Sequence, residues 1–331
     1  MERIKTMKSL KSTKNLLIIL IISVFSLYFN ACSDNSVSDN QTDDEYIREV
    51  ITMGYSTPNG EDDDLMSSEK DDLDDGGPVG NNGGMTPIDS LMRWGRRITG
   101  VSKSVTITNE GDSIKNATIT TNITGVFMIV GIVNNIVDTI SKPYTEEFKR
   151  LAIFKRVDHN PRPRHNWRLY KVSMLDGESK TPQVGTDYVK MNKVEVYVNG
   201  DLKYTLNGPD FTQNIFTTRH FGGAGIPEVS VGDNIKLAVT TYSTQSEQDY
   251  VAWHWGKRNF GFHREPFAMV SQVPNGSGWD RVYEKTFTIN ENIRRKKLNG
   301  CISASTYKSL RDDSPAEFAS DLLGTPYKVL E

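Results

Sequence analysis

Residues 194–206 read Val-Glu-Val-Tyr-Val-Asn-Gly-Asp-Leu-Lys-Tyr-Thr-Leu, and this stretch indicates the fold class of the second half of the chain. Apolar side chains alternate with polar ones on both sides of Asn-Gly-Asp, as in two β-strands that each bury one face. All the apolar positions are even-numbered, so they share a face only if paired residue numbers sum to an even number. The stretch therefore predicts a hairpin with a three-residue loop and Val198 opposite Leu202, in preference to a two-residue Asn-Gly turn.

The same alternation continues along the chain at 235–239, 251–255 and 283–289, with turn residues between the runs. Short alternating strands separated by turns are typical of a β-sandwich, so we expect an all-β sandwich of immunoglobulin-like type over 181–291. Residues 292–331 then form a tail that we expect to fold back on a domain. Ser314, Pro315 and Glu317 are typical of a helix start, which predicts a short helix over 315–323 within this tail.

The region before the sandwich, residues 43–180, begins with helical signals and continues with strand signals. Thr42-Asp43-Asp44-Glu45 resembles a capping box, and an apolar stripe follows until Gly54. Thr86-Pro87 suits the start of a second helix, which should end before Thr99. From Val101 the period changes to two, with strands expected at 117–123, 126–130, 151–157 and 167–174. The order predicts an α+β domain in which two helices pack on one face of an antiparallel sheet.

This order resembles the nuclear-transport-factor-two-like cone fold. The resemblance is carried by Arg96-Arg97-Ile98 before the first long strand, and by Phe154-Lys155-Arg156 followed across a loop by Trp167-Arg168-Leu169. It implies a conical domain whose interior can hold a small ligand. Enzymes of that family use an Asp/His pair inside the cone, and no such pair can be placed in this chain.

Charge is distributed unevenly along the chain. The net charge is −3, but residues 33–90 hold 16 acidic and two basic residues, whereas 91–331 hold 25 acidic and 32 basic residues. Acidic runs and Gly-Asn clusters fill residues 55–85, where little can be buried and the carboxylates repel one another. We therefore expect 55–85 to be a disordered acidic insert, and residues 32–42 to be a polar tether.

The N-terminal segment indicates export. Five basic residues precede Leu16–Phe29, an uncharged apolar run too short to cross a bilayer, which needs about 20 residues. A small residue, Ala31, then precedes Cys32. The segment resembles the signal peptide and lipobox of bacterial lipoproteins, which implies cleavage after residue 31 and acylation, for example by palmitate, of Cys32. Cys301 would then have no partner for an intrachain disulfide.

Two groups of side chains are candidate binding sites. A hairpin with Trp255 opposite Phe260 would bring His254 and His263 to one face as diagonal neighbours, about 7–8 Å apart, with Glu265 beside them. Two histidines and a carboxylate can hold a transition metal, and the alternative is a pair of surface histidines. A cationic loop supplies the second group, which can receive an anion or the chain's own acidic segment: His159, Arg162, Arg164 and His165.

These features favour a lipid-anchored protein of the cell envelope, attached to the outer membrane and facing outward. Ser33 rather than Asp follows the modified cysteine, which resembles outer-membrane sorting, and the acidic residues beyond it resemble loosely the export signals of surface lipoproteins. We expect a non-enzymatic binding or adhesion module whose partner is an envelope protein or polysaccharide, with no cofactor and no nucleic acid. The alternative is a small-ligand carrier or enzyme that uses the cavity of the first domain.

Overall fold

A computed structural model describes residues 41–53, 73–75, 79–80, 90–133, 136–182, 188–218, 225–255, 263–289 and 297–330. The contacts divide the chain into two units, Met1–Thr42 and Asp43–Glu331. Every helix and strand below belongs to the second unit. The predicted signal peptide, Cys32 and most of the tether lie outside the described residues. Within the described part of the chain, no helix combines the length and apolarity needed to cross a membrane.

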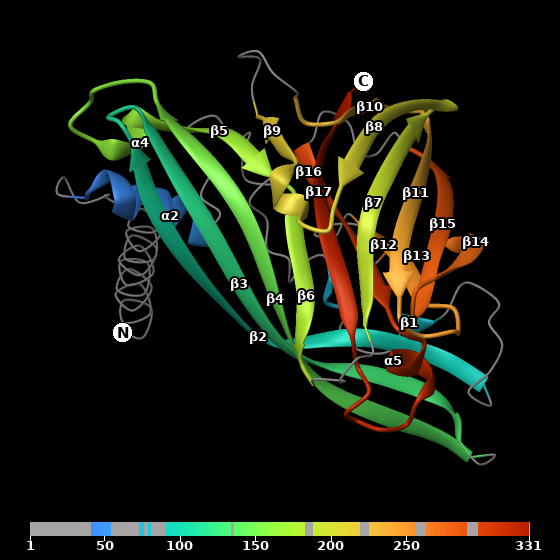
Figure 1. Ribbon diagram of the computed structural model, residues 1–331. Helices are drawn as coiled ribbons and strands as arrows, with labels where there is room; N and C mark the ends of the chain where they lie inside the picture. The colour runs from blue at the N-terminus through green and yellow to red at the C-terminus, as the bar shows by residue number, and fades with distance from the viewer. Residues whose placement is uncertain are drawn as a thin grey trace, which may run out of the picture. The chain divides into compact units, whose positions relative to one another are not determined.

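The second unit is built mainly from two β-sheets (Figure 1). The larger has twelve strands and runs in the order β1-β2-β3-β4-β6-β17-β16-β12-β13, while β5 and β9 extend from β4 and β10 pairs with β17. Its strands have the following bounds: β1 Val79–Gly80, β2 Ser90–Glu110, β3 Ile114–Val133, β4 Ile136–Arg156, β5 Trp167–Ser173, β6 Leu175–Thr181, β9 Ile215–Thr217, β10 Glu228–Ser230, β12 Tyr250–Trp255, β13 His263–Pro266, β16 Lys297–Ser305 and β17 Ser320–Leu330.

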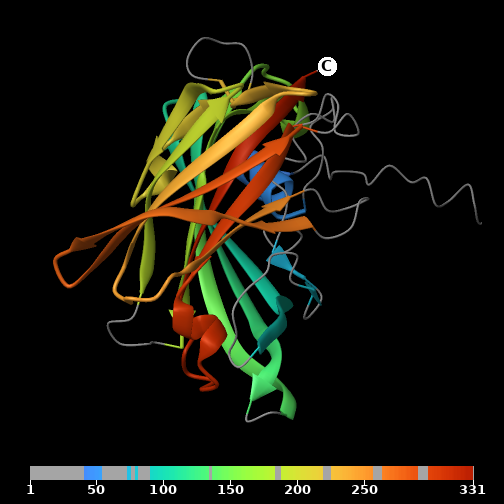
Figure 2. The same cartoon turned by 90° about the vertical axis from the view of Figure 1, so that its right-hand side faces the viewer.

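The smaller sheet has five strands in the order β14-β15-β11-β7-β8. Their bounds are β7 Val189–Val198, β8 Asp201–Asn207, β11 Asn234–Ser243, β14 Ala268–Asn275 and β15 Gly278–Thr288. The alternating runs read from the sequence at 194–206, 235–239 and 283–289 lie in four of these strands, and the run at 251–255 is β12 of the larger sheet. Figure 2 shows the β14–β15 hairpin projecting from the rest of the unit.

The main hydrophobic core lies between the two sheets. One cluster of buried side chains joins the valines of β7 and the apolar residues of β11 to residues of β12, β16 and β17. Trp253 of β12 stacks on Phe287 of β15 with ring centres 6.0 Å apart, which links the sheets directly. The two sheets therefore form a β-sandwich-like structure. The immunoglobulin-like sandwich expected over 181–291 is not shown as such, because most strands of the larger sheet come from outside that range. A second cluster of buried side chains involves β2, β3 and β4. It includes Phe127 of β3, Phe148 of β4 and Phe318, which precedes β17.

The predicted first helix is α2, Asp43–Met53, as expected. Its apolar stripe is buried against the larger sheet. Asp43 and Asp44 at its first turn form ion pairs with Arg156, at 2.6 Å, and Lys115, at 2.5 Å. The other named helical segments in the part of the chain that the structure describes are short: α4 Pro163–Asn166, the 3-10 turn η2 Phe211–Gln213 and α5 Tyr307–Arg311.

The second predicted helix is wrong, and with it the α+β cone fold. Residues 90–98 open strand β2, so the first half of the chain is a β-structure with α2 at its edge. Trp94, Arg96 and Ile98 are all buried, which is the alternation of a strand. Because Arg96 is charged, this alternation is not visible in the hydropathy of the sequence. Nor are the strands expected at 117–123 and 126–130 separate, because both belong to β3.

The hairpin at 199–200 also differs from the prediction. Val198 pairs with Asp201 around a two-residue Asn199-Gly200 turn, and both turn residues have positive φ, 53° and 93°. Such a turn matches the twist of the flanking strands. A β-bulge between Val196 and Tyr197 then restores the register, so that Val196 faces Tyr204. The bulge changes the sum of paired residue numbers from odd to even within one hairpin, which a fixed alternation does not predict. Leu202, on the turn side of the bulge, is 49% exposed.

The tail folds back, but as a strand. Residues 315–316 form a turn, and the predicted helix over 315–323 is wrong because Ser320–Leu330 is strand β17. Phe318, which precedes the strand, and Leu322 are both buried and belong to the same core cluster, so the two apolar side chains that predicted the helix pack in the core without it. β17 lies between β6 and β16, so the boundary predicted at 180/181 falls within a continuous hydrogen-bonded sheet.

The acidic insert expected at 55–85 is packed where it is described. Leu73 and Asp75 are 1% and 6% exposed, and the backbone N–H of Asp75 donates to the carbonyl of Arg96. Local composition conceals this burial, because Leu73 is the one apolar residue in an acidic run and the cationic partner of Asp75 is Arg264, 189 residues along the chain. The rest of the insert lies outside the described residues, apart from the short strand β1.

Candidate functional site

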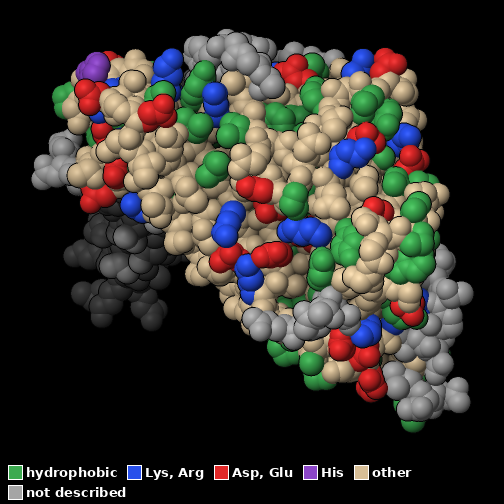
Figure 3. Space-filling model, in the orientation of Figure 1, with side chains coloured by type: hydrophobic (Ala, Val, Ile, Leu, Met, Phe, Trp, Pro, Cys, Tyr) green, Lys and Arg blue, Asp and Glu red, His purple; other side chains and the backbone are tan. Residues whose placement is uncertain are grey.

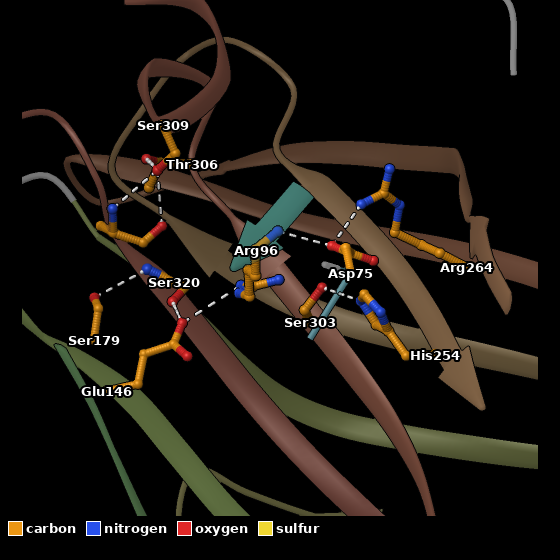
Figure 4. A network of polar contacts seen from close by, with 11 residues as sticks. Asp75, Arg96, Glu146, Ser179, His254, Arg264, Ser303, Thr306, Ser309 and Ser320 are labelled. Carbon is orange, nitrogen blue, oxygen red and sulfur yellow. Dashed lines mark hydrogen bonds and ion pairs between the residues drawn. The ribbon is translucent and has the colours of Figure 1, made fainter. Parts of the chain in front are cut away.

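A network of charged side chains is buried where β2, β4, β12, β13, β16 and β17 meet (Figure 4). Asp75 lies at one end. Its Oδ2 accepts hydrogen bonds from the backbone N–H of Arg96 at 2.9 Å and from the Arg264 guanidinium at 3.0 Å. Arg264 also donates to the carbonyl of Trp94 at 2.9 Å, and its guanidinium lies 3.5 Å from the centre of the Trp94 ring. Burial lowers the pKa of Arg264 to about 10, against the opposing effect of Asp75.

The middle of the network is an ion pair between Arg96 and Glu146. The guanidinium lies 3.5 Å from Glu146 Oε1, and both side chains are fully buried. Ser320 of β17 donates its hydroxyl to the same carboxylate oxygen at 2.8 Å. Burial raises the pKa of Glu146, while Arg96 and Ser320 lower it. Among the described residues, Arg96 Nε and Nη1 and Glu146 Oε2 have no hydrogen-bond partner, so the hydrogen-bonding capacity of the pair is only partly satisfied.

A histidine–serine pair that sequence reasoning missed lies beside Asp75 and Arg264 (Figure 4), and its histidine, His254, pairs with Arg264 in the β12–β13 ladder. His254 Nε2 lies 2.9 Å from Ser303 Oγ across the β12–β16 ladder. Such a pair can act as base and nucleophile in acyl transfer. Here His254 and Ser303 are 2% and 1% exposed, so a substrate cannot contact the hydroxyl without separation of the sheet. The network as a whole fastens residues 73–75 and the strands of the larger sheet to one another.

The side chains proposed as metal ligands do not converge in the described structure. Trp255 pairs with His263, whereas the sequence predicted Phe260 as its partner. His254 pairs with Arg264, and Trp253 pairs with Glu265. Since paired residues share a face, His254 and Glu265 lie on opposite faces of the ladder. Glu265 forms an ion pair with Lys285 at 2.5 Å, and the side chain of His263 lies outside what is described. Within the described ranges no group of three potential metal ligands occurs.

The cationic loop lies beside α2. His159 and Arg162 are exposed between β4 and α4, while Arg164 and His165 belong to α4 and are half-buried. Arg164 Nε donates to His165 Nε2 at 3.2 Å. The acidic first turn of α2 pairs with Arg156 and Lys115, neither of which belongs to the loop, so the expected contact of the loop with the chain's own acidic segment stays a prediction. The anion site remains a prediction.

Two further buried carboxylates are held elsewhere in the fold. Asp249 accepts from Arg281 at 2.6 Å and from Ser243 at 2.8 Å, and burial raises its pKa to about 6. Asp321 accepts from Lys190 Nζ at 2.9 Å and from the backbone N–H of Met191 at 2.6 Å. Burial raises the pKa of Asp321 to about 7 against the effect of Lys190. Both carboxylates bridge the larger sheet or its loops to the smaller sheet.

No protein-family model matches the chain, and no significant match to it was found among curated proteins or solved structures.

Proposed function

We propose that the chain is a lipid-anchored protein of the bacterial cell envelope, cleaved after Ala31 and acylated on Cys32. The observation that carries the proposal is the short uncharged run Leu16–Phe29 followed by a small residue and a cysteine. Residues 33–42 then link the cysteine to α2, the first element of the folded unit. Acylation of Cys32 would attach that unit to a membrane without a spanning helix.

We propose further that the folded unit is a binding or adhesion module without catalytic activity, whose partner is an envelope protein or a polysaccharide. Its support is the two-sheet architecture, in which the charged side chains of the buried network hold strands together. The alternative, a ligand carrier or enzyme, depended on a conical first domain, and the structure has an extended β-structure there instead. The buried His254–Ser303 pair gives that alternative no accessible nucleophile.

Acylation of Cys32 is directly testable. Replacing Cys32 with serine should abolish incorporation of labelled palmitate and leave an uncleaved or wrongly cleaved precursor. Cys301→Ser is the matched control, because Cys301 is buried in β16 and should not affect labelling. Fatty-acid incorporation that is unchanged in Cys32→Ser would rule out attachment at this residue.

The proposed face of the membrane gives a separate prediction. Ser33 follows the cysteine, and acidic residues begin at Asp34, which favours outer-membrane attachment with outward exposure. Protease added to intact cells should therefore remove the folded unit. Complete protection until the outer membrane is permeabilised would place the protein in the periplasm.

A further inference from the structure

Two lysines lie over one tyrosine on the outer side of β4 and β5, with an arginine on the same side, and we call Lys155, Arg168, Tyr170 and Lys171 the basic face. Lys155 pairs directly with Arg168 in the β4–β5 ladder, so their side chains share a face. The ammonium groups of Lys155 and Lys171 lie 5.4 and 5.3 Å from the centre of the Tyr170 ring. Trp167 and Leu169, on the other side of β5, are buried in the core.

The segment that carries the basic face has an excess of positive charge in its sequence. Arg168 donates hydrogen bonds to the carbonyls of Arg164 and Trp167, which carry no net charge. Between residues 155 and 171 the sequence has six Lys or Arg and one acidic residue, Asp158. Like charges gathered around one ring repel each other, and an anionic partner would offset that repulsion.

The surroundings limit where such a partner can make contact. The turn between β2 and β3, which adjoins the end of β4, carries the exposed acids Glu110 and Asp112. Contact is therefore confined to the β4–β5 side and the loop with His159 and Arg162. Figure 3 shows histidine, Lys and Arg side chains at the end of the unit where Figure 1 draws α4 and β5, with some carboxylates among them.

The tether enters the folded unit at the same end of β4 as the basic face, but on the opposite face of the sheet. Arg156 follows Lys155 in β4 and pairs with Trp167, and it forms its 2.6 Å ion pair with Asp43, the first residue of α2. Only residues 33–42 separate that helix from Cys32, and such a segment spans about 35 Å at most. An acyl chain on Cys32 would therefore keep the basic face near the surface of the bilayer.

We propose that the basic face binds the phosphate-bearing headgroups of the membrane to which the protein is anchored. The inference rests on the proposed attachment at Cys32. Lysine and arginine side chains near an anionic bilayer each strengthen binding by about fivefold, and tyrosine is favoured at the depth of the headgroups. Acylation together with a basic surface gives two membrane signals, which hold a protein more stably than one acyl chain. The folded unit would then lie against the bilayer on its β4–β5 side.

The test uses residues 33–331, which lack the acylated cysteine but retain the compact unit Asp43–Glu331. This protein should sediment with vesicles of phosphatidylglycerol and phosphatidylcholine, and not with vesicles of phosphatidylcholine alone. Added salt should release it, because exposed charges are screened. The double variant Lys155→Gln/Lys171→Gln should lower the partition coefficient by about 25-fold, the product of two fivefold effects.

A matched control removes two exposed lysines from the smaller sheet, Lys193→Gln/Lys203→Gln, for the same change in net charge. This control should bind anionic vesicles as the parent does, with circular dichroism spectra confirming that all the proteins are folded. Equal binding to neutral and anionic vesicles, or equal losses in the two double variants, would overturn the inference. Palmitate labelling of Cys32 is measured separately, so labelled protein without vesicle binding refutes only the basic face, and vesicle binding without labelling refutes only the anchor.

Discussion

Replacing Glu146 with alanine should lower the free energy of unfolding by about 3–5 kcal/mol, because it leaves the Arg96 guanidinium buried without its counter-ion. Arginine cannot release its proton in a protein, so the buried charge persists at every accessible pH. Arg96 Nε and Nη1 already lack partners in the described structure, so no other described group can replace the carboxylate. Urea unfolding of the parent and the variant at pH 7 measures the difference.

Removal of the other partner should be less costly, particularly in acid. In Arg96→Met the apolar stem still packs near Phe127, and Glu146 can become neutral by taking a proton. Burial raises the folded-state pKa of Glu146 above its unfolded value, so between the two values only the folded chain holds the proton. The free energy of unfolding of Arg96→Met should therefore fall as pH rises between these two pKa values. The loss of stability relative to the parent should be smaller at pH 5 than at pH 8.

The double variant and a surface control complete the comparison. Glu146→Ala with Arg96→Met should be more stable than Glu146→Ala alone, since no unpaired charge is left. Lys203→Met, which breaks the exposed pair with Asp201, should change stability by about 0.5 kcal/mol or less. A larger loss for Arg96→Met than for Glu146→Ala at pH 5 would contradict this account of the network.

The second large effect is expected at Gly300 of β16. A Cβ atom added there would fall within the indole ring of Trp253 on the neighbouring strand. The ring is buried and stacked on Phe287, so it cannot move without disturbing the contact between the sheets. Gly300→Ala should therefore cost about 3 kcal/mol, at the upper end of the range for overpacked cores. Thermal or urea unfolding measures the loss.

A smaller residue at position 253 should partly rescue the variant. Trp253→Leu alone leaves a cavity, but in Gly300→Ala the new methyl group occupies part of that space. The double variant should thus be more stable than the sum of the two single losses predicts. Gly225→Ala is the control, because a Cβ there meets nothing within 4 Å, and it should be near neutral. Strictly additive losses would show that the contact between Gly300 and Trp253 is not the cause.

The sequence was informative where local chemistry and hydrophobic period agree. The first turn of α2 and the alternating runs of the sandwich follow rules that act over a few residues, and the structure has both. The predictions that depended on a single local signal failed. A helix start at Ser314-Pro315 is compatible with a turn, and the register of a hairpin changes when a bulge adds one residue.

The buried network could not be found by reading for catalytic or metal-binding patterns, because its members lie up to 189 residues apart. A signal was nevertheless present. Tyr144, Glu146, Phe148 and Arg150 alternate with polar neighbours, and all four are buried. A charged residue within an alternating apolar series indicates an ionic partner inside the core. The identity of that partner follows from strand order, which depends on contacts between distant segments.

The position of β17 has a consequence for biosynthesis. Residues 320–330 are the last described strand in the sequence, yet they occupy an interior place in the larger sheet, between β6 and β16. During translation, β6 is made well before β17, its neighbour in the sheet. The place between β6 and β16 therefore stays empty until the ribosome has completed residue 330. Pairing across such sequence distances is also slow. The larger sheet of such a nascent chain therefore stays incomplete until residues 320–330 have been made, long after β6.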